Sequence, residues 1–405
     1  MRINNKNLIT RTLAIAFIAL NMSSCSAQLN TKKVLSHAEK QTDLLLSEIP
    51  KADNKNGTLV SPRTFEHGKL ELVPSKDWTS GFFPGSMWYL YELTKNEKWK
   101  TEAAKFTELV EQEKFNGKTH DMGFKIYCSF GNGYRLTKDQ SYKEVIIQSA
   151  KTLITRFNPK VGTLRSWDHN SDKWDFPVII DNMMNLELLF EATKLTGDSV
   201  YHKIAVSHAN TTLKNHFRPD YSSYHVISYN PTTGAVEKKN THQGFAHESA
   251  WARGQAWAIY GYTLCYRETK DPKYLEQAQN VANFIFSNKN MPEDLIPYWD
   301  FDDPAIPNVS RDVSAATIIA SALYELSTYS SNKADYLKKA NAMMSSIDKK
   351  YTSDLGTNKG FILDHSTGHK PKNSEVDVPI NYADYYYMEA LVRAERLKNK
   401  QAVVQ

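Results

Sequence analysis

The sequence predicts an all-α protein whose helices form a closed ring of six hairpins, the (α/α)6 barrel. Three observations lead to this prediction. A short polar segment recurs along the 405 residues, and each copy lies between two helical patterns. The helix before each copy is apolar on nearly all sides, whereas the helix after it is amphipathic. Long loops rich in aromatic residues precede the apolar helices, and only short turns follow them.

The recurring segment is typical of the turn in a helical hairpin. In each copy an apolar helical run ends, a few polar residues follow, and a second helix begins near an aromatic residue. The copies read LTKNEKW from Leu93, LTKDQSY from Leu136, LTGDSVY from Leu195, ETKDPKY from Glu268 and, more loosely, YSSNKADY from Tyr329.

Apolar residues at the helical period predict about twelve helices along the chain. The segment NMMNLELLFEATKLT is apolar nearly all round, as buried helices are, and EKWKTEAAKFTELVEQ is amphipathic. The predicted ranges are 35–49, 84–95, 97–112, 122–136, 140–157, 182–196, 198–216, 254–269, 272–288, 312–329, 333–350 and 380–397.

Alternation of buried and half-buried helices predicts an inner ring wrapped by an outer ring. Twelve helices make six pairs, and the first helix is expected to close the circle as the outer partner of the last. Strands are expected to be few and confined to loops. One hairpin is predicted in YSSYHVISYNPTTGAVEKKN, around Pro231–Gly234.

The N-terminus reads as a targeting segment. Arg2, Lys6 and Arg11 precede TLAIAFIALNM, an apolar run too short to span a membrane as a mature helix. Residues 22–25 match a bacterial lipobox with Cys25 as the lipidated first residue, whereas cleavage after Ala27 would release a soluble protein. We expect a lipoprotein signal within residues 1–27, export to the periplasm or a membrane tether through Cys25, and one (α/α)6 domain over residues 28–405.

Composition argues against several classes of protein. The net charge of +5 is small for the length and the basic residues are scattered, so no nucleic-acid partner is expected. Cys128 and Cys265 make no disulfide framework, and no Cys/His cluster has the spacing of a zinc site, so no metal is expected. The sequence indicates no obligate protein partner.

In a ring of up-and-down hairpins all inner helices begin at the same end, so the long loops before them converge on one mouth. Tryptophan faces there can stack on sugar rings, and helix N-termini with Arg253 favour an anionic ligand. Asp121 and Asp181 form a pair of carboxylates, the usual catalytic groups in glycoside hydrolysis. The converging residues are Trp78, His120, Asp121, Asp181, His225, Gln243, Trp251, Arg253, Trp257, Arg311 and Asp312.

Asp181 lies in the apolar run DFPVIIDNMMNLELL and has two compatible interpretations. It can be a helix N-cap, for which Asp is a preferred residue. Its apolar neighbours can also raise the pKa of the carboxyl and make it a proton donor near neutral pH. Asp121 has the same two interpretations, and for Asp312 the cap is favoured.

Structural alternatives exist for the other mouth residues. Arg253 can form a structural ion pair with Glu248 or Asp181, and His120 can be a satisfied loop histidine. About half of the eight tryptophans are expected in the core, because Trp is often largely buried. The shared placement of these residues at one end of the ring favours a functional site.

Several long motifs resemble family 88 glycoside hydrolases, the unsaturated glucuronyl hydrolases, over roughly residues 35–397. The motifs are DWTSGFFPGSMWYLYELT, HDMGF, IIDNMMNLELLFEA, THQG, SAWARGQAWAIYGYTLCYRET, RDVSAA and SEVDVPINYADYYYMEALVR. The resemblance implies an (α/α)6 barrel that removes a 4,5-unsaturated uronate from the non-reducing end of oligosaccharides left by polysaccharide lyases. It implies no metal or organic cofactor.

Carried over by motif, Asp181 matches the family's general acid/base and Asp121 its second essential carboxylate, often described as the nucleophile. Phe83 stands where many relatives have Trp, and HSTGHKPKNS matches a loop linked to the neighbouring sugar and its sulfates. The positions expected to bind substrate are Trp78, His120, His225, Thr241, Gln243, Trp251, Arg253 and Trp257.

The family's chemistry implies hydration of the substrate's C4=C5 double bond, with one carboxyl that gives a proton and then takes one from water. The nearest rival is an unsaturated rhamnogalacturonyl hydrolase, against which SAWARGQAW and SEVDVP argue. A conventional inverting glycosidase would act on saturated substrates. A non-catalytic sugar-binding lipoprotein would need the aromatic residues and Arg253 but not both Asp121 and Asp181.

Overall fold

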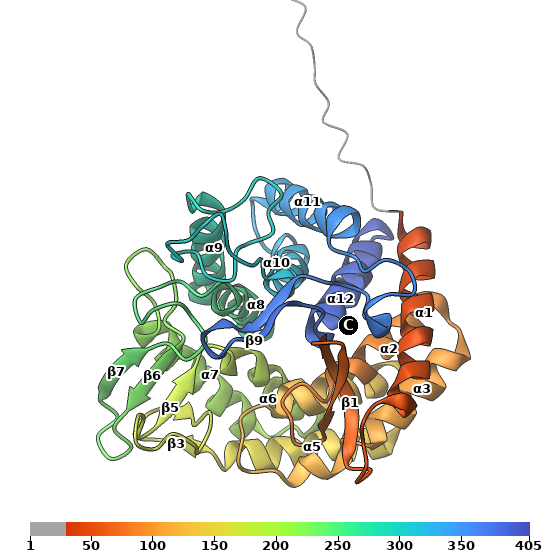
Figure 1. Cartoon of the computed structure of the whole chain (residues 1–405). Helices are drawn as coiled ribbons and strands as arrows, with labels where there is room; N and C mark the ends of the chain where they lie inside the picture. The colour runs from red at the N-terminus through yellow and green to blue at the C-terminus, as the bar shows by residue number, and fades with distance from the viewer. Residues whose placement is uncertain (1–29) are drawn as a thin grey trace, which may run out of the picture.

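Six inner helical segments surround the axis of a ring, and six outer helices cover them (Figure 1). The computed structural model describes residues 30–405, and within them it confirms the (α/α)6 barrel. The inner helices are α2 (Phe82–Thr94), a π-helix (Gly123–Gly131) continued by α4 (Asn132–Thr137), α6 (Asn182–Thr196), α8 (Ala252–Thr269), α10 (Val313–Leu326) and α12 (Asn381–Lys398). The outer helices are α1 (Thr31–Glu48), α3 (Glu97–Glu108), α5 (Gln140–Ile154), α7 (Ser199–Asn215), α9 (Pro272–Ser287) and α11 (Lys333–Lys350).

Helix α1 lies outside α2 and α12, as expected for the helix that closes the circle (Figure 1). The Thr31 hydroxyl donates to Glu395 of α12, and the Trp99 indole of α3 donates to Glu39 at 2.8 Å. The helix begins at Thr31, earlier than predicted, because the Asn30 side chain accepts a hydrogen bond from the Lys33 N–H and caps it.

The recurring turn has a plain physical basis. The inner helix ends at a residue in the left-handed conformation, and the outer helix then begins at an Asn or Asp that caps it. Lys138 ends α4 with φ 59°, and Asp139 accepts the Ser141 N–H at 2.8 Å. Gly197 ends α6 with φ 75°, and Asp198 accepts the Val200 N–H at 2.9 Å. The looser fifth copy has no side-chain cap at Asn332.

The helix predicted over 122–136 begins instead as a π-helix at Gly123, two residues after Asp121. A Cβ at Gly123 would lie 2.7 Å from the Cα of Asn185, so only glycine allows this close approach to α6. The Asn185 side chain accepts the Phe124 N–H at 3.1 Å. Single wide turns of this kind occur often at functional sites, and here one fixes the segment that carries Asp121.

The strands lie in the loops that precede the inner helices, which we call the front end of the barrel (Figure 1). The predicted hairpin is confirmed as β6 (Val226–Tyr229) and β7 (Val236–Asn240), which pair with β5 (Pro177–Ile179). A second hairpin, β8 (Ser366–His369) and β9 (Ser374–Val378), crosses the front end. Two short strands that were not predicted, β3 (Phe157–Asn158) and β4 (Thr163–Leu164), pair with each other.

The hairpin of β1 (Leu59–Glu66) and β2 (Lys69–Pro74) was not predicted. Pro62 interrupts its first strand, and the pairing shifts register twice, so the alternation of apolar residues is blurred. In its two-residue turn, His67 and Gly68 both adopt positive φ, 52° and 76°, as such a hairpin turn requires. Gly68 was therefore a local sequence signal for this turn.

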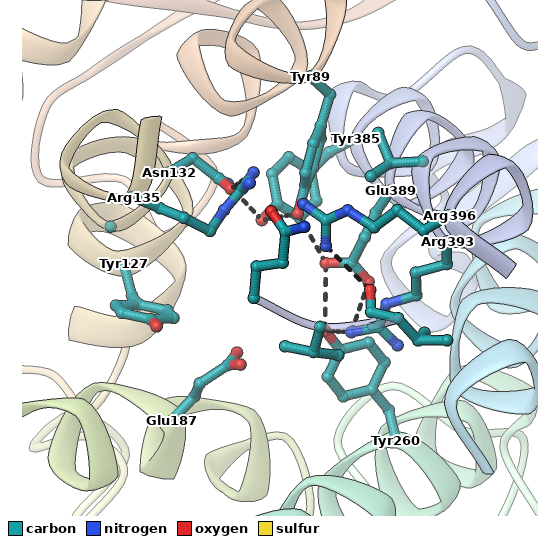
Figure 2. Close-up of a pocket in the computed structure, with 15 residues that line it drawn as sticks. Tyr89, Tyr127, Asn132, Arg135, Glu187, Tyr260, Tyr385, Glu389, Arg393 and Arg396 are labelled. Atoms are coloured by element: carbon teal, nitrogen blue, oxygen red, sulfur yellow. Dashed lines mark hydrogen bonds and ion pairs between the residues drawn. The ribbon is translucent and has the colours of Figure 1, made fainter. Parts of the chain in front are cut away.

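The opposite end, the rear end, is closed by buried ion pairs and by the C-terminal tail. A small cavity of about 50 Å³ lies there, and its lining includes the tail residues Val403–Gln405. Figure 2 shows Tyr89, Asn132 and Glu389 among the residues around it. Arg396 donates to the Val403 carbonyl at 2.9 Å and holds the tail across the helix ends.

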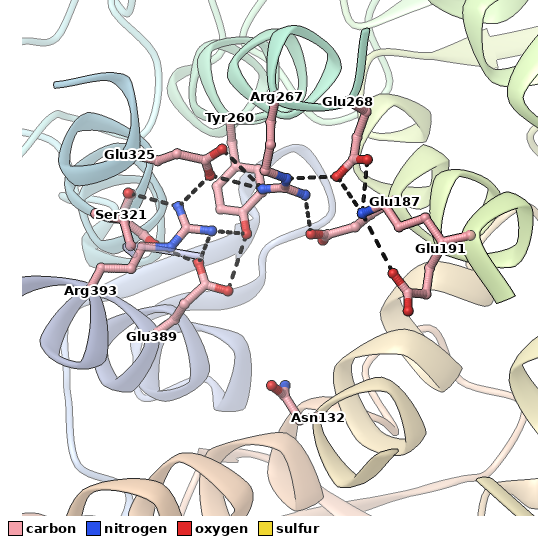
Figure 3. Close-up of polar contacts among 12 residues, drawn as sticks. Asn132, Glu187, Glu191, Tyr260, Arg267, Glu268, Ser321, Glu325, Glu389 and Arg393 are labelled. Atoms are coloured by element: carbon pink, nitrogen blue, oxygen red, sulfur yellow. Dashed lines mark hydrogen bonds and ion pairs between the residues drawn. The ribbon is translucent and has the colours of Figure 1, made fainter. Parts of the chain in front are cut away.

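The ion pairs at the rear end form a connected chain (Figure 3). Arg393 pairs with Glu389 and Glu325, and Arg267 donates to both Glu325 oxygens at 3.0 Å and pairs also with Glu187. Each buried charge therefore has a partner, as burial of charges requires.

Within residues 30–405 no helix combines the length and apolar character needed to cross a bilayer. The predicted signal segment, with Cys25 and its lipobox, lies outside the described residues.

Candidate active site

A cavity of about 310 Å³ opens at the front end, where the inner helices begin. We call it the front cavity. Five of the predicted residues line it: Trp78, His120, Asp121, Asp181 and Gln243. Residues that were not predicted also line it, among them Arg63, Trp167, His169, His242, His369, Glu375 and Tyr382.

Asp181 occupies the N-cap position of α6, but its side chain makes no capping hydrogen bond. It follows strand β5, and the Ile180 N–H donates to the carbonyl of His225, the residue before β6, at 3.1 Å. The residue is 7% exposed, and its Oδ2 atom is buried without a protein partner. Burial raises the pKa of Asp181 to about 6, against the opposing influence of His120 and Arg253. The carboxyl is therefore placed to exchange a proton near neutral pH.

Asp121 has the opposite electrostatic setting. Burial acts to raise its pKa, but the neighbouring His120 and hydrogen bonds from His120 and Thr119 outweigh it and hold the pKa below its ordinary value. The Thr119 hydroxyl donates to Oδ2 at 2.6 Å, and His120 Nε2 lies 3.1 Å from Oδ1. The cavity thus contains one carboxyl that is readily protonated and one that stays ionised, the pattern of an acid/base pair.

His225 directly precedes β6, and its Nε2 lies 3.7 Å from Asp181 Oδ2. Its Nδ1 accepts two backbone N–H groups, from His242 and Gln243, each at 3.1 Å. The ring proton therefore belongs on Nε2, directed at Asp181, and burial lowers the pKa of His225 well below its ordinary value. A neutral imidazole at this position can donate a hydrogen bond without adding charge.

Arg253, Trp251 and Trp257 lie under the cavity and are not among its lining residues. Arg253 Nη1 donates to Asp312 at 2.7 Å and to the Thr367 carbonyl, and Nη2 donates to the Gly368 carbonyl at 2.6 Å. The ion-pair partner of Arg253 is thus Asp312, and neither Glu248 nor Asp181, the partners considered as structural alternatives, is paired with it. Only Nε of the guanidinium is left without a protein partner.

Aromatic rings support this arginine. Its guanidinium lies 4.5 Å from the Trp251 ring centroid and 5.3 Å from that of Tyr382. Trp257 is fully buried and packs against Phe124, at 5.2 Å between centroids. The sequence underestimated such burial: seven of the eight tryptophans are buried, all except Trp78.

Two further predicted residues hold loops in place. The Thr241 hydroxyl accepts the Gly244 N–H at 2.7 Å, which closes the turn that contains Gln243. Gln243 itself donates to the Gly368 carbonyl at 3.1 Å and lines the cavity.

Asp312 is confirmed as a helix cap, because Oδ1 accepts the Ser314 N–H at 3.1 Å. Arg311 pairs with Asp294 and does not line the cavity.

The roof of the front cavity joins two hairpins. Arg63 of β1 donates to both carboxylate oxygens of Glu375 in β9, at 2.6 and 2.7 Å, and to Asp77 at 2.9 Å. Glu375 has φ 55°, an uncommon conformation for a non-glycine residue. Strain of this kind is concentrated near binding sites, where surrounding contacts hold it.

Buried polar atoms without a protein partner gather around the front cavity. Folded proteins satisfy more than about 90% of buried polar groups, so a cluster of exceptions indicates a polar ligand. The cluster comprises His120 Nδ1, Asp181 Oδ2, His225 Nε2, Arg253 Nε, Trp257 Nε1 and the Tyr382 hydroxyl.

Within residues 30–405 no group of three or more His, Cys, Asp or Glu side chains is arranged to hold a metal ion.

Comparisons with known proteins place this site in context. Residues 51–399 match the family model described as Glycosyl Hydrolase Family 88. The chain is 52% identical over 397 residues to an unsaturated glucuronyl hydrolase of Formosa agariphila, which covers 97% of this chain and 99% of that relative. It is 32% identical over 371 residues to an unsaturated chondroitin disaccharide hydrolase of Streptococcus pneumoniae, covering 89% and 90% of the two chains. The crystal structure of an unsaturated glucuronyl hydrolase specific for heparin is similar with a TM-score of 0.86, at 44% identity, over 92% of this chain and 99% of that one.

Proposed function

Because the chain belongs to glycosyl hydrolase family 88 and is a glycoside hydrolase of the unsaturated glucuronyl hydrolase type, we propose that it acts by hydrating the substrate's C4=C5 double bond, with Asp181 as the general acid and base. Asp121 is the second carboxylate of this mechanism.

The substrate's double bond belongs to an enol ether, since C5 bears the ring oxygen. Asp181 donates its proton to C4, and the electron pair of the double bond forms the new C–H bond. The cation left at C5 is shared with the ring oxygen, and the ionised Asp121 stabilises it. Asp181, now a carboxylate, takes a proton from water as the water oxygen bonds to C5. The resulting hemiketal opens, and collapse at the anomeric carbon releases the aglycone with its own oxygen.

The observation that carries this proposal is the state of the Asp181 carboxyl. It lines the front cavity, has a pKa raised to about 6 by burial, and makes no helix-capping hydrogen bond. A group that must give a proton and then take one back works best when its pKa lies near the working pH. His225, with its Nε2–H directed at Asp181, can stabilise the carboxylate formed midway.

Isotope labelling tests the reaction type. In H₂¹⁸O, the heavy oxygen should enter the uronate-derived product at C5, and the aglycone should keep its own oxygen. In D₂O, deuterium should appear at C4. Heavy oxygen at the anomeric carbon, with the C4=C5 bond intact, would instead indicate ordinary glycoside hydrolysis by two carboxylates.

The substrate proposed is an oligosaccharide with a 4,5-unsaturated uronate at its non-reducing end. Support comes from the names of the relatives, one of which is specific for heparin and another of which acts on chondroitin disaccharides. A panel of lyase-generated disaccharides, followed by loss of absorbance of the conjugated double bond, measures the preference. Turnover confined to a rhamnogalacturonan-derived disaccharide would favour the rival activity, and binding without turnover would favour a sugar-binding protein.

We also propose that the protein is exported as a lipoprotein, on the strength of the lipobox that ends at Cys25. One acyl chain binds membranes only marginally, but the several chains of a lipoprotein make a stable tether. Cys25→Ser should move the protein from the membrane fraction to the soluble fraction, whereas Ser24→Ala should leave it in the membrane. A soluble wild-type protein that begins at Gln28 would contradict the proposal.

A further inference from the structure

Tyr382 is a buried residue of the front cavity that no motif singled out. It is the second residue of α12, and it lines the cavity beside Trp78, with ring centroids 5.0 Å apart. Its start-of-helix position is fixed by Asn381, whose side chain donates to the Pro62 carbonyl at 2.8 Å and to the Thr79 carbonyl at 3.1 Å. The ring therefore cannot move far without disturbing three segments of the front end.

The Tyr382 hydroxyl has no hydrogen-bond partner in the protein, although the residue is fully buried. Burying such a group without a partner costs about 1–3 kcal/mol. Burial also raises the pKa of Tyr382 above its ordinary value, so the hydroxyl stays protonated and remains a donor. A phenylalanine would fill the same space without this cost, and Tyr382 differs from the similarly unpaired Tyr387 in lining the front cavity.

The nearest cationic neighbour suggests what the hydroxyl binds. The Arg253 guanidinium lies 5.3 Å from the Tyr382 ring centroid, and Arg253 Nε is another buried donor that lacks a protein acceptor. The remaining donors of Arg253 are occupied by Asp312 and two backbone carbonyls. Tyr382 thus offers a hydroxyl donor to the cavity, and Arg253, packed against its ring, adds a positive charge, a combination that suits an anionic ligand.

We propose that Tyr382 binds substrate directly, by donating its hydroxyl hydrogen to the carboxylate of the unsaturated uronate next to Arg253. The proposal rests on the uronate being held beside Asp181, as the proposed function requires. With the carboxylate fixed at C5, the adjacent C4 is presented to the acid, and Tyr382 sets the orientation of the ring in the cavity.

The test compares Tyr382→Phe with Tyr387→Phe. Tyr387 is a matched control, because its hydroxyl is also buried without a protein partner but does not line the front cavity. Both variants should melt at or above the wild-type temperature, since each loses an unsatisfied hydroxyl. Tyr382→Phe should lower kcat/KM by about tenfold to a hundredfold, the range for a hydrogen bond to a charged group. Tyr387→Phe should leave kcat/KM unchanged.

A second substrate identifies the group that Tyr382 contacts. Wild-type enzyme should lose activity on the uronate methyl ester, and that loss should be smaller in Tyr382→Phe, because the two changes remove the same interaction. An unchanged ester penalty in the variant, or kcat/KM within twofold of wild type on the acid, would overturn the proposal. Equal losses in both Phe variants would also overturn it. The position of ¹⁸O in the product tests hydration separately, so failure of either proposal is recognisable.

Discussion

At the scale of single residues, Asp181 and Asp198 occupy the same position in their helices but differ in what their side chains do. Asp198 caps α7 by accepting the Val200 N–H at 2.9 Å, whereas Asp181 leaves the start of α6 uncapped and faces the front cavity. Asp198 is therefore a structural aspartate, whereas the Asp181 carboxyl is free to exchange a proton.

Asp181→Asn is expected to lower kcat by about 10²–10⁴-fold, because an amide cannot donate the proton, while substrate binding is largely kept. Rates on an unsaturated disaccharide and equilibrium binding by calorimetry measure the two quantities. Asp198→Asn is the control and should keep full activity, since Asn is an equally good cap. A loss of less than tenfold in Asp181→Asn would assign the acid to another residue.

The proposed mechanism needs Asp181 in its protonated form, and this sets the expected pH dependence. With a pKa raised to about 6 by burial, the carboxyl is protonated below that pH and ionises above it. We expect kcat/KM to fall about tenfold for each pH unit on the alkaline side of about pH 6. Loss of activity on the acid side should begin only below the ordinary range of a carboxyl, because the pKa of Asp121 is lowered. A rate that rises through pH 6 to an alkaline plateau would show that ionised Asp181 is needed first.

The sequence was enough to predict two candidate catalytic carboxylates, but it was not enough to predict how deeply Arg253 is buried. Asp121 and Asp181 follow from helix starts that converge on one mouth. Arg253 was expected at the surface of that mouth, but the carbonyls of β8, which arrive from a distant part of the chain, enclose it. Tyr382 also lies at the start of an inner helix, but it was not predicted as a site residue. In INYADYYY it is one of several tyrosines, and such a run is typical of a buried helix. Only the fold distinguishes its hydroxyl from those of its neighbours.

At the scale of elements, the recurring turn was predictable because both of its requirements are local. A left-handed residue must end one helix and an Asn or Asp must begin the next, and both appear within a few letters of sequence. The β1–β2 hairpin escaped prediction because its stability depends on distant partners, among them the ion pair between Arg63 and Glu375.

The left-handed positions allow a stability test. Lys138 has φ 59°, which costs a residue with a Cβ more than it costs glycine, so Lys138→Gly should stabilise the protein by about 0.5–1 kcal/mol. Gly197→Ala should destabilise it by about 1 kcal/mol through the backbone alone, since a Cβ there would contact nothing within 4 Å. Thermal or denaturant unfolding measures both changes. Equal shifts of the same sign would contradict the explanation of the turn.

At the scale of the whole molecule, alternation of apolar and amphipathic helices was enough to predict the ring and to place the site at one end of it. The other end was not predicted. Its closure depends on arginine and glutamate residues from five inner segments and on a tail that turns back at Arg396, and no short stretch of sequence carries that information.

The closed rear end decides how a sugar chain can be processed. A chain cannot thread through the barrel, so it enters by its end, gives up one terminal residue and must leave again. Under the proposed hydration mechanism, the shortened chain has a saturated end without a C4=C5 double bond, so it cannot react a second time. The yield should therefore be one uronate per chain, whatever the chain length. Lyase-generated di-, tetra- and hexasaccharides at equal molar concentration should lose equal amounts of absorbance at completion.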